Sequence, residues 1–477
     1  MKERLLPIAL TALFLVLGSF VLDLPGVQMD EALFASVLNN PKVPPVTIQL
    51  IFVRIPAMCF EYIGTLKTGF YALIWSVFEP SAATVHFPAV MLGALTIYLF
   101  ARLLQRLKQP PWAAILLATD ATFLMTTRSD WGPVAVQHLL ATAGAYAGVR
   151  YAQTLQLKWV AAAGFLFGLG FWDKITFLWI LFALAAGVLA TARHLIKPIP
   201  VAVLAGFFLV GCYPLIVYNY KTGGKSFKGN ASLDTGPVWS KAKQIWVCLG
   251  DQNIFGAGND RALPPVEPVI PIAAMVSRVD YAIHPYVPPI AAWLFTASLL
   301  ALPWLYRIPF YRFCLIALIA GYGYMFALKN AGGGAHHIVL LWPLPHLLIG
   351  CLPLRRWMLV AIAAANLLQI NHFYAQFLRR EVSTEWSDAT AALAARLKSD
   401  TRTYHILDWG ILDSIHLLNQ GKNDLYYGSA PNARYISHVP QLTVFPNDTK
   451  IIPEETIADS AGRPVFVISR SAPIEGK

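Results

Sequence analysis

The chain has 477 residues, of which 56% are hydrophobic and only 13% are charged, and its mean hydropathy is +0.53. A soluble domain carries roughly twice that share of charged residues, so the composition excludes an ordinary soluble enzyme and indicates an integral membrane protein. The net charge of +11 could favour nucleic acid, but the basic residues lie between apolar segments. Membrane orientation therefore explains them, and we expect no nucleic-acid partner.

About eleven apolar segments approach the roughly 20 residues that a membrane-spanning helix needs. They cover approximately residues 5–23, 84–104, 111–127, 133–149, 158–173, 175–192, 197–218, 287–306, 309–328, 336–353 and 357–375. The first could be a signal peptide, but no small-x-small cleavage site follows it, so we interpret it as a retained anchor.

The basic residues that connect these segments all fall on one side of the predicted topology. They are Lys2, Arg4, Arg102, Arg106, Lys108, Arg150, Lys158, Arg193, Lys197, Arg307, Arg312, Arg355 and Arg356. The positive-inside rule then places the N-terminus in the cytoplasm and, after eleven crossings, the C-terminus outside. We expect a bacterial inner-membrane protein whose C-terminal part is periplasmic.

Two regions outside the spans have a different character. Residues 24–83 contain "EALFASVLNN" and "TGFYALIWSVF", which are typical of amphipathic helices on the outer membrane surface. After residue 376, "TYHILDWG" and "RPVFVISR" alternate like strands, and "ILDSIHLLNQG" is a short helix that ends at Gly. The predicted fold is therefore an α-helical polytopic membrane domain over residues 1–375 with outer juxtamembrane helices, followed by a small extracytoplasmic α/β domain over residues 376–477.

Ionisable residues gather near the outer ends of the predicted spans, where charge is costly and usually signals function. The candidates are Asp30, Glu31, Lys67, Arg128, Asp130, His336 and His337. Transfer of a sugar from a lipid phosphate to a hydroxyl needs such a mixture. A carboxylate removes the proton of the acceptor, and cations stabilise the phosphate that leaves.

The N-terminal third also resembles a known family. "LDLPGVQMDEALFA" is similar to the first outer loop of GT-C glycosyltransferases of the protein O-mannosyltransferase and aminoarabinose transferase kind, where an Asp is often followed by Glu. Asp30 matches that Asp. "GTLKTGFYALIWSVFEPSAATVHFPAV" resembles the family's next stretch, and Lys67 matches a lysine that contacts the lipid phosphate, although Thr68 and Gly69 replace the usual Pro-Pro.

Two later segments continue the resemblance in the family's order. "LLATDATFLMTTRSDWGPVAVQ" resembles the third span and second outer loop, where Arg128 and Asp130 match an Arg and an acid close to the first Asp. "AGGGAHHIVLLWPLPHLLIG" resembles a later segment with a basic or His-Tyr pair, whose place His336 and His337 take.

The resemblance implies an inverting glycosyltransferase that uses a polyprenyl-phosphate-linked sugar donor at the outer face. Asp30 would be the general base, Asp130 would orient Asp30 or the acceptor, and Lys67 and Arg128 would hold the leaving phosphate. Glu31, His336 and His337 would support these roles. The acceptor would be a protein, a lipid or a polysaccharide. No cofactor is required, although a divalent cation that bridges Asp30 and Asp130 would also fit.

Other interpretations stay open at this stage. A membrane transporter or lipid flippase also places charges in the membrane, although usually near the midplane and within repeated halves, and no repeat is visible here. A sensor that uses the C-terminal domain is a third class. Locally, Asp30 and Glu31 could simply begin a helix, Arg128 and Asp130 could form a structural ion pair, and Asp173 and Lys174 could pair in a turn.

Overall fold

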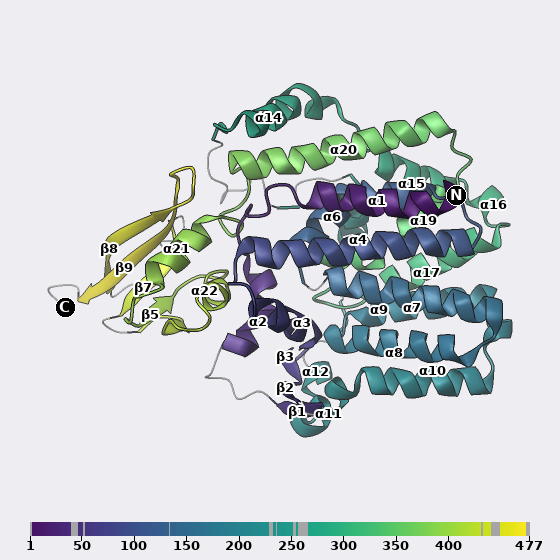
Figure 1. The fold of residues 1–477 in the computed structure, drawn as a ribbon, viewed down its shortest axis with the longest axis horizontal. Helices are drawn as coiled ribbons and strands as arrows, with labels where there is room; N and C mark the ends of the chain where they lie inside the picture. The colour runs from purple at the N-terminus through teal and green to yellow at the C-terminus, as the bar shows by residue number, and fades with distance from the viewer. Residues whose placement is uncertain are drawn as a thin grey trace.

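The computed structural model describes residues 2–39, 46–50, 53–132, 134–228, 232–234, 236–250, 254–255, 266–430, 433–439 and 449–473. A bundle of helices that lie side by side forms most of the molecule, and a small sheet domain lies at one end of it (Figure 1). The start of the first helix lies at the other end of the bundle, away from the sheet domain.

The bundle contains both long helices and short ones. These are α1 (Lys2–Gly18), α4 (Ala82–Arg106), α5 (Trp112–Ala118), α6 (Ala121–Arg128), α7 (Val134–Thr154), α8 (Leu157–Asp173), α9 (Phe177–Thr191), η1 (Arg193–Leu195), α10 (Pro198–Gly211), α15 (Ile290–Leu300), α16 (Leu302–Leu305), α17 (Pro309–Phe326), α18 (Ala335–Ile338), η3 (Val339–Leu341), α19 (Leu344–Gly350) and α20 (Arg356–Arg379). Each of the predicted apolar segments falls on one or more of them.

Among the described residues, three helices are long and apolar enough to cross a membrane without a break, namely Ala82–Arg106, Pro309–Phe326 and Trp357–Arg379. A fourth span results if α10 and α11 (Tyr213–Thr222), which are bent by 66°, count as one. Some of the other predicted spans are single helices that are shorter or less apolar, such as Phe177–Thr191, and others are broken. Residues 111–127, for example, form two helices because Asp120 caps the second one by accepting a hydrogen bond from the backbone N–H of Phe123. The total of eleven crossings stays a prediction.

Glycines let two helices of the bundle approach closely. A Cβ atom at Gly164 of α8 would lie 2.4 Å from the carbonyl oxygen of Leu204, and one at Gly168 would lie 2.2 Å from that of Phe208, both on α10. Small residues spaced by four are typical of helix contacts inside membranes, where close packing rather than the hydrophobic effect holds helices together.

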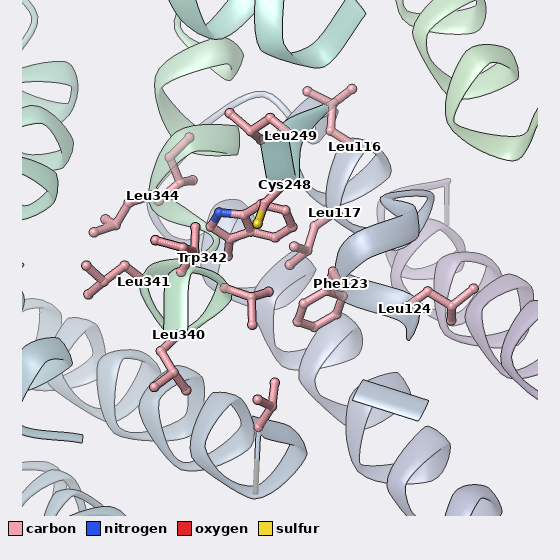
Figure 2. Packing of buried hydrophobic residues seen from close by; sticks show 14 of the residues in the cluster. Leu116, Leu117, Phe123, Leu124, Cys248, Leu249, Leu340, Leu341, Trp342 and Leu344 are labelled. Atoms are coloured by element: carbon pink, nitrogen blue, oxygen red, sulfur yellow. The ribbon is translucent and has the colours of Figure 1, made fainter. Parts of the chain in front are cut away.

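One continuous apolar core runs through the bundle and connects segments that are distant in sequence. Figure 2 shows Trp342 and Leu344 packed beside Cys248, with Leu117 and Phe123 close by. Trp342 belongs to the turn between η3 and α19, and Cys248 to α13 (Val238–Leu249). The short helices α5, α6 and α19 are therefore fixed by packing in the bundle centre rather than by their own length.

Elements outside the bundle gather at the end next to the sheet domain (Figure 1). They are α2 (Met29–Asn39), β1 (Thr47–Leu50), β2 (Val53–Pro56), β3 (Met58–Phe60), β4 (Ile63–Gly64), α3 (Leu66–Trp75), α11 and α12 (Lys225–Lys228). The helices expected within residues 24–83 are present as α2 and α3, and their place on the outer membrane surface stays a prediction. The two antiparallel pairs between them, β1 with β2 and β3 with β4, were not predicted from the sequence.

The C-terminal part forms the predicted small α/β domain. It comprises α21 (Ala389–Leu397), β5 (Tyr404–Ile406), α22 (Leu412–Leu418), β6 (Leu425–Tyr427), β7 (Arg434–His438), β8 (Thr449–Ala458) and β9 (Pro464–Pro473). The strand order is β6-β5-β7-β9-β8, with β5 parallel to both neighbours and the other pairs antiparallel. The domain has its own apolar core, which includes Leu393, Ile406 and Ile436. A domain boundary near residue 376 stays our proposal.

The sheet domain contacts the start of α2. Leu417 of α22 packs in one apolar cluster with Val27, Ala32 and Val85, and the hydroxyl of Tyr427 donates to the sulfur of Met29 at 3.8 Å. The two parts of the chain therefore meet at the first turn of α2, where the predicted catalytic acid lies.

Candidate active site

A cavity of about 450 Å³ opens between α2, the ends of α8 and α9, and the segment before α18. Its polar lining residues are Asp30, Tyr62, Thr176, Lys174, Ser226, Asn330, His336 and His337, and its apolar ones are Leu33, Phe34, Ile63, Ile175, Leu178, Trp179, Phe227, Tyr324, Leu328 and Ala331, with Gly132 completing the wall. An acid, an ammonium group and two imidazoles thus share one apolar-walled space.

Asp30 lies in the first turn of α2, where a negative charge favours the helix N-terminus. Its backbone N–H donates to Gln28 Oε1 at 2.6 Å, and its carboxylate oxygen Oδ2 accepts from Trp131 Nε1 at 2.9 Å. Burial raises the pKa of Asp30 above its ordinary value, while the charge of Lys174 and the Trp131 hydrogen bond oppose that rise. A partly buried carboxylate of raised pKa is suited to accept a proton near neutral pH.

Trp131 holds Asp30 from an aromatic cluster. Its ring centroid lies 5.1 Å from those of His336 and Trp386 and 6.1 Å from that of Phe255. Trp386 belongs to the segment that leads into the sheet domain. Packing from three directions fixes the indole, so its N–H is directed at one carboxylate oxygen.

Lys174 is the cation of the cavity, and the sequence analysis did not select it. It directly follows α8, is 4% exposed, and donates from Nζ to the carbonyl of Gly132 at 3.4 Å. Burial lowers the pKa of Lys174 to about 8, and the charge of Asp30 is the largest influence that opposes this fall. The sequence signal was a lysine between two apolar segments, which we interpreted as a local pair with Asp173.

Asp130 and Lys67 form a buried ion pair directly behind the cavity wall. The turn between α6 and α7 positions Asp130, whose φ of +42° and that of Gly132, +72°, make the chain reverse sharply. Asp130 Oδ1 accepts from the N–H of Ala135 at 3.2 Å. Lys67 Nζ lies 3.4 Å from the ring centroid of Phe34, a cavity residue, so an aromatic ring covers the ammonium.

Arg128 takes a different position from the one expected for a phosphate ligand. It is fully buried at the end of α6, and its guanidinium donates to the carbonyls of Gly18 at 3.1 Å, Phe20 at 3.3 Å and Val21 at 2.6 Å. Gly18 is the last residue of α1, and Phe20 and Val21 follow it closely, so these carbonyls lack the N–H donors that a continuing helix would supply. Arg128 does not line the cavity, so we withdraw its assignment to the leaving phosphate and interpret it as the cap of α1.

Glu31 also points away from the cavity. Both carboxylate oxygens lie 3.2 Å from His86 Nε2, and Oε2 accepts from the N–H of Gln28. His86 Nδ1 lies 2.6 Å from the carbonyl oxygen of Leu22, so the imidazole connects Glu31 to the segment that follows α1. In this arrangement Glu31 connects α2 to α4 through His86 and does not line the cavity, so we interpret it as a structural residue and no longer as a support for catalysis.

His336 and His337 lie on the cavity wall, as the resemblance implied for a substrate contact. Their ring centroids are 4.2 Å apart, and His337 meets the edge of Trp179 at 5.5 Å. Among the described residues, neither Nδ1 atom has a hydrogen-bond partner. Both imidazoles can therefore donate to or accept from a ligand in the cavity.

The sheet domain adds a further acid beside Asp30. Asp413 of α22 is buried, and burial together with the charge of Asp30 raises the pKa of Asp413 to about 6. The acids Asp413 and Asp408 in turn contribute, after burial, to a raised pKa of Tyr427. The end of the parallel strands that faces α2 is thus acidic, and Asp413 lies close enough to Asp30 for the two charges to interact.

The structure brings together part of the predicted constellation. Asp30, His336 and His337 line the cavity with Lys174, and the pair Lys67 and Asp130 lies behind it. The carboxylates of Asp30 and Asp130 have different partners, Trp131 and Lys67, and a divalent cation that bridges them stays a prediction.

Comparisons with known proteins show what the sequence and the fold resemble. Residues 69–218 match the family model of dolichyl-phosphate-mannose-protein mannosyltransferase. Among solved structures, the chain is similar to ArnT from Cupriavidus metallidurans bound to undecaprenyl phosphate, with a TM-score of 0.55, 13% identity and 97% of each chain covered. The chain has the GT-C fold. No curated protein matches it significantly by sequence.

Within the GT-C fold, the matched family segment runs from α3 into α11 and includes Asp130 and Lys174. Asp30 and Lys67 precede it. The residues that the family model matches thus include the α6–α7 turn and the end of α8, which help to line the cavity. Helix α2 also lines the cavity but lies outside the matched residues.

Proposed function

We propose that this protein is an inverting glycosyltransferase that moves a sugar from a polyprenyl-phosphate donor to a hydroxyl acceptor at the outer face of the membrane. The observation that carries the proposal is that Asp30 and Lys174, a base and a cation, line one cavity whose other walls are largely apolar. The family model over residues 69–218 and the similarity to an ArnT structure bound to undecaprenyl phosphate support the same reaction class.

In the proposed step, the acceptor oxygen attacks the anomeric carbon from the side of Asp30. Asp30 takes the proton of the hydroxyl, and the bond between the anomeric carbon and the phosphate oxygen breaks. The phosphate keeps that electron pair, so its negative charge grows in the transition state. The Lys174 ammonium stabilises this charge, and His336 and His337 donate hydrogen bonds to phosphate or sugar oxygens.

The remaining groups position this pair. Trp131 directs one oxygen of Asp30, which leaves the other oxygen for the acceptor proton. Lys67 neutralises Asp130 behind the wall, so the α6–α7 turn that carries Trp131 and Gly132 stays in place. Phe34, Leu178 and Phe227 offer apolar surface for the first isoprene units of the donor.

The test is turnover by the purified full chain in detergent. The probe is a set of undecaprenyl-phosphate-linked sugars labelled in the sugar, and mass spectrometry follows free undecaprenyl phosphate. We expect release of the lipid phosphate with transfer of the label to an added membrane extract, and much slower release without acceptor.

A parallel assay in sealed vesicles separates this function from transport. If the labelled lipid crossed the bilayer with its sugar-phosphate bond intact and no free undecaprenyl phosphate formed, the transferase would be ruled out in favour of a flippase.

A further inference from the structure

A second cluster of metal-ligating side chains lies outside the cavity, where α14 (Pro271–Ile283) packs on α20. It consists of Asp280 of α14, His284 of the following turn η2 (His284–Tyr286), and His372 of α20. One ligand atom from each residue lies within 4.8 Å of the other two. None of these residues touches the proposed transfer site.

The sequence spacing explains why two of these ligands converge. Asp280 and His284 are four residues apart, so one helical turn places both side chains on the same face. That face packs against α20, where the Asn371 side chain donates to the carbonyl of Val276 at 3.1 Å and fixes the register. His372 is the next residue of α20 and completes the set.

The cluster already has short contacts between its members. His372 Nδ1 lies 2.9 Å from Asp280 Oδ1, a distance close to that between two ligands of one tetrahedral ion, roughly 3.3 Å for bonds of about 2 Å. The ring centroids of His284 and His372 are 3.4 Å apart, and the rings are parallel to within 3°. The stacked rings bring one nitrogen of each within 4.8 Å of the other, so both imidazoles can reach one ion after a ring rotates.

A second layer of contacts orients the carboxylate, as metal ligands usually require. Arg379 donates from Nη2 to the other oxygen of Asp280, Oδ2, at 2.8 Å, which leaves Oδ1 for an ion. Arg379 is itself paired with Glu381. Two carboxylates against one guanidinium leave one negative charge in the group, which offsets half of the charge of a divalent ion.

We propose that Asp280, His284 and His372 form a binding site for one divalent transition-metal ion that clamps α14 to α20. Two imidazole nitrogens and one carboxylate oxygen favour Zn²⁺ or a similar ion over Mg²⁺ and Ca²⁺, which prefer oxygen ligands. An ion bound by two imidazoles lies in the plane of both rings, so binding turns at least one ring out of the parallel stack.

The clamp is connected to the cavity by the end of α20. Phe377 of α20 and Trp386, which follows α20, both pack on Phe255, and Trp386 also packs on Trp131, the donor to Asp30. The ion is therefore structural: it takes no part in the reaction and stabilises the helix from which this aromatic contact extends.

The test uses the purified full chain, stripped with a chelator and titrated with Zn²⁺ or Co²⁺ alone. We expect one equivalent of bound zinc by elemental analysis, a visible Co²⁺ absorption spectrum typical of nitrogen and oxygen ligands, and a rise of several degrees in the unfolding temperature. His284→Gln leaves the Asp280, His372 and Arg379 contacts in place, and should lose the metal, the spectrum and the temperature rise. His194→Gln, on η1 outside the cluster, is the matched control and should keep all three.

The zinc content of each of three proteins, wild type, His284→Gln and His336→Gln, can refute the proposed metal site. Wild-type protein that binds no zinc refutes the site, and so does His284→Gln protein that still binds a full equivalent. Zinc lost instead from His336→Gln protein would place the ion in the cavity and also refute the clamp. Because metal content and unfolding are measured without substrate, these results do not depend on the proposed transferase activity.

Discussion

Trp131 offers the sharpest test of how the site controls its base. Replacing Trp131 with Phe removes the indole N–H that donates to Asp30 Oδ2 at 2.9 Å and keeps an aromatic ring among Phe255, Trp386 and His336. The hydrogen bond favours the ionised form of Asp30, so its loss must raise the pKa of that carboxyl further above its ordinary value.

The size of the shift follows from the strength of such a bond. A hydrogen bond to a charged group contributes about 1.5–3 kcal/mol, and one pKa unit corresponds to about 1.4 kcal/mol. Trp131→Phe should therefore move the acidic limb of the kcat/KM profile upward by about 1–2 pH units. At pH values above both limbs, the variant should approach the wild-type rate, because Asp30 is then ionised in both proteins.

The assay is initial-rate release of polyprenyl phosphate between pH 5 and 9. Trp386→Phe is the matched control, since Trp386 packs on Trp131 without touching Asp30, and its limb should stay in place. A Trp131→Phe protein that loses activity equally at every pH, with an unmoved limb, would refute the reasoning, because the indole would then act through packing and not through the Asp30 proton.

Three further substitutions test the other assignments. Lys174→Gln should lower kcat/KM for the lipid donor about 10- to 100-fold, as expected for the loss of one charge-assisted contact to the leaving phosphate. Lys158→Gln at the opposite end of α8 should leave kcat/KM unchanged, and equal kcat/KM values for the two variants would remove Lys174 from the phosphate site. Arg128→Met should lower the free energy of unfolding by roughly 2–4 kcal/mol, because three carbonyls lose their hydrogen-bond donor, and melting curves measure this loss. The kcat of the folded fraction should change little. A rise in KM for the lipid donor without a loss of stability would instead assign Arg128 to the phosphate site. Asp413 has its pKa raised to about 6, so its burial destabilises the fold above pH 6 and no longer does so below its ordinary value near 4. Asp413→Asn should therefore stabilise the protein by up to about 3 kcal/mol at pH 7.5 and by about half of that at pH 5. An equal change in melting temperature at both pH values would contradict the assignment.

Local pattern was enough to predict the helical segments and the sheet domain. The apolar segments all became helices, and the acids Asp30 and Glu31 fell in a first helical turn, because hydrophobic length and helix-end preferences act within a few residues. The breaks within residues 111–127 and 336–353 were not anticipated. The first break is set by the local cap Asp120, and the second lies at the turn of Trp342, which packs beside Cys248 of the distant helix α13.

The site was predicted in part, and the misplaced residues share one cause. Arg128, Glu31 and Lys67 have the right charge for their expected roles, but their partners are the carbonyls after α1, His86 of α4, and Asp130. Such partners are fixed by tertiary packing, which residue type alone does not specify. Lys174 was not chosen as a site residue because we interpreted it as the partner of its sequence neighbour Asp173, although its side chain lines the cavity.

The central claim is that Asp30 removes the proton of the acceptor. The most direct measurement is single-turnover transfer by Asp30→Asn protein, with binding of undecaprenyl phosphate determined on the same sample. A general base contributes about 10²- to 10⁴-fold, so we expect the transfer rate to fall by at least 10²-fold while lipid binding stays within a few-fold of wild type. Transfer at the wild-type rate by this variant would contradict the account.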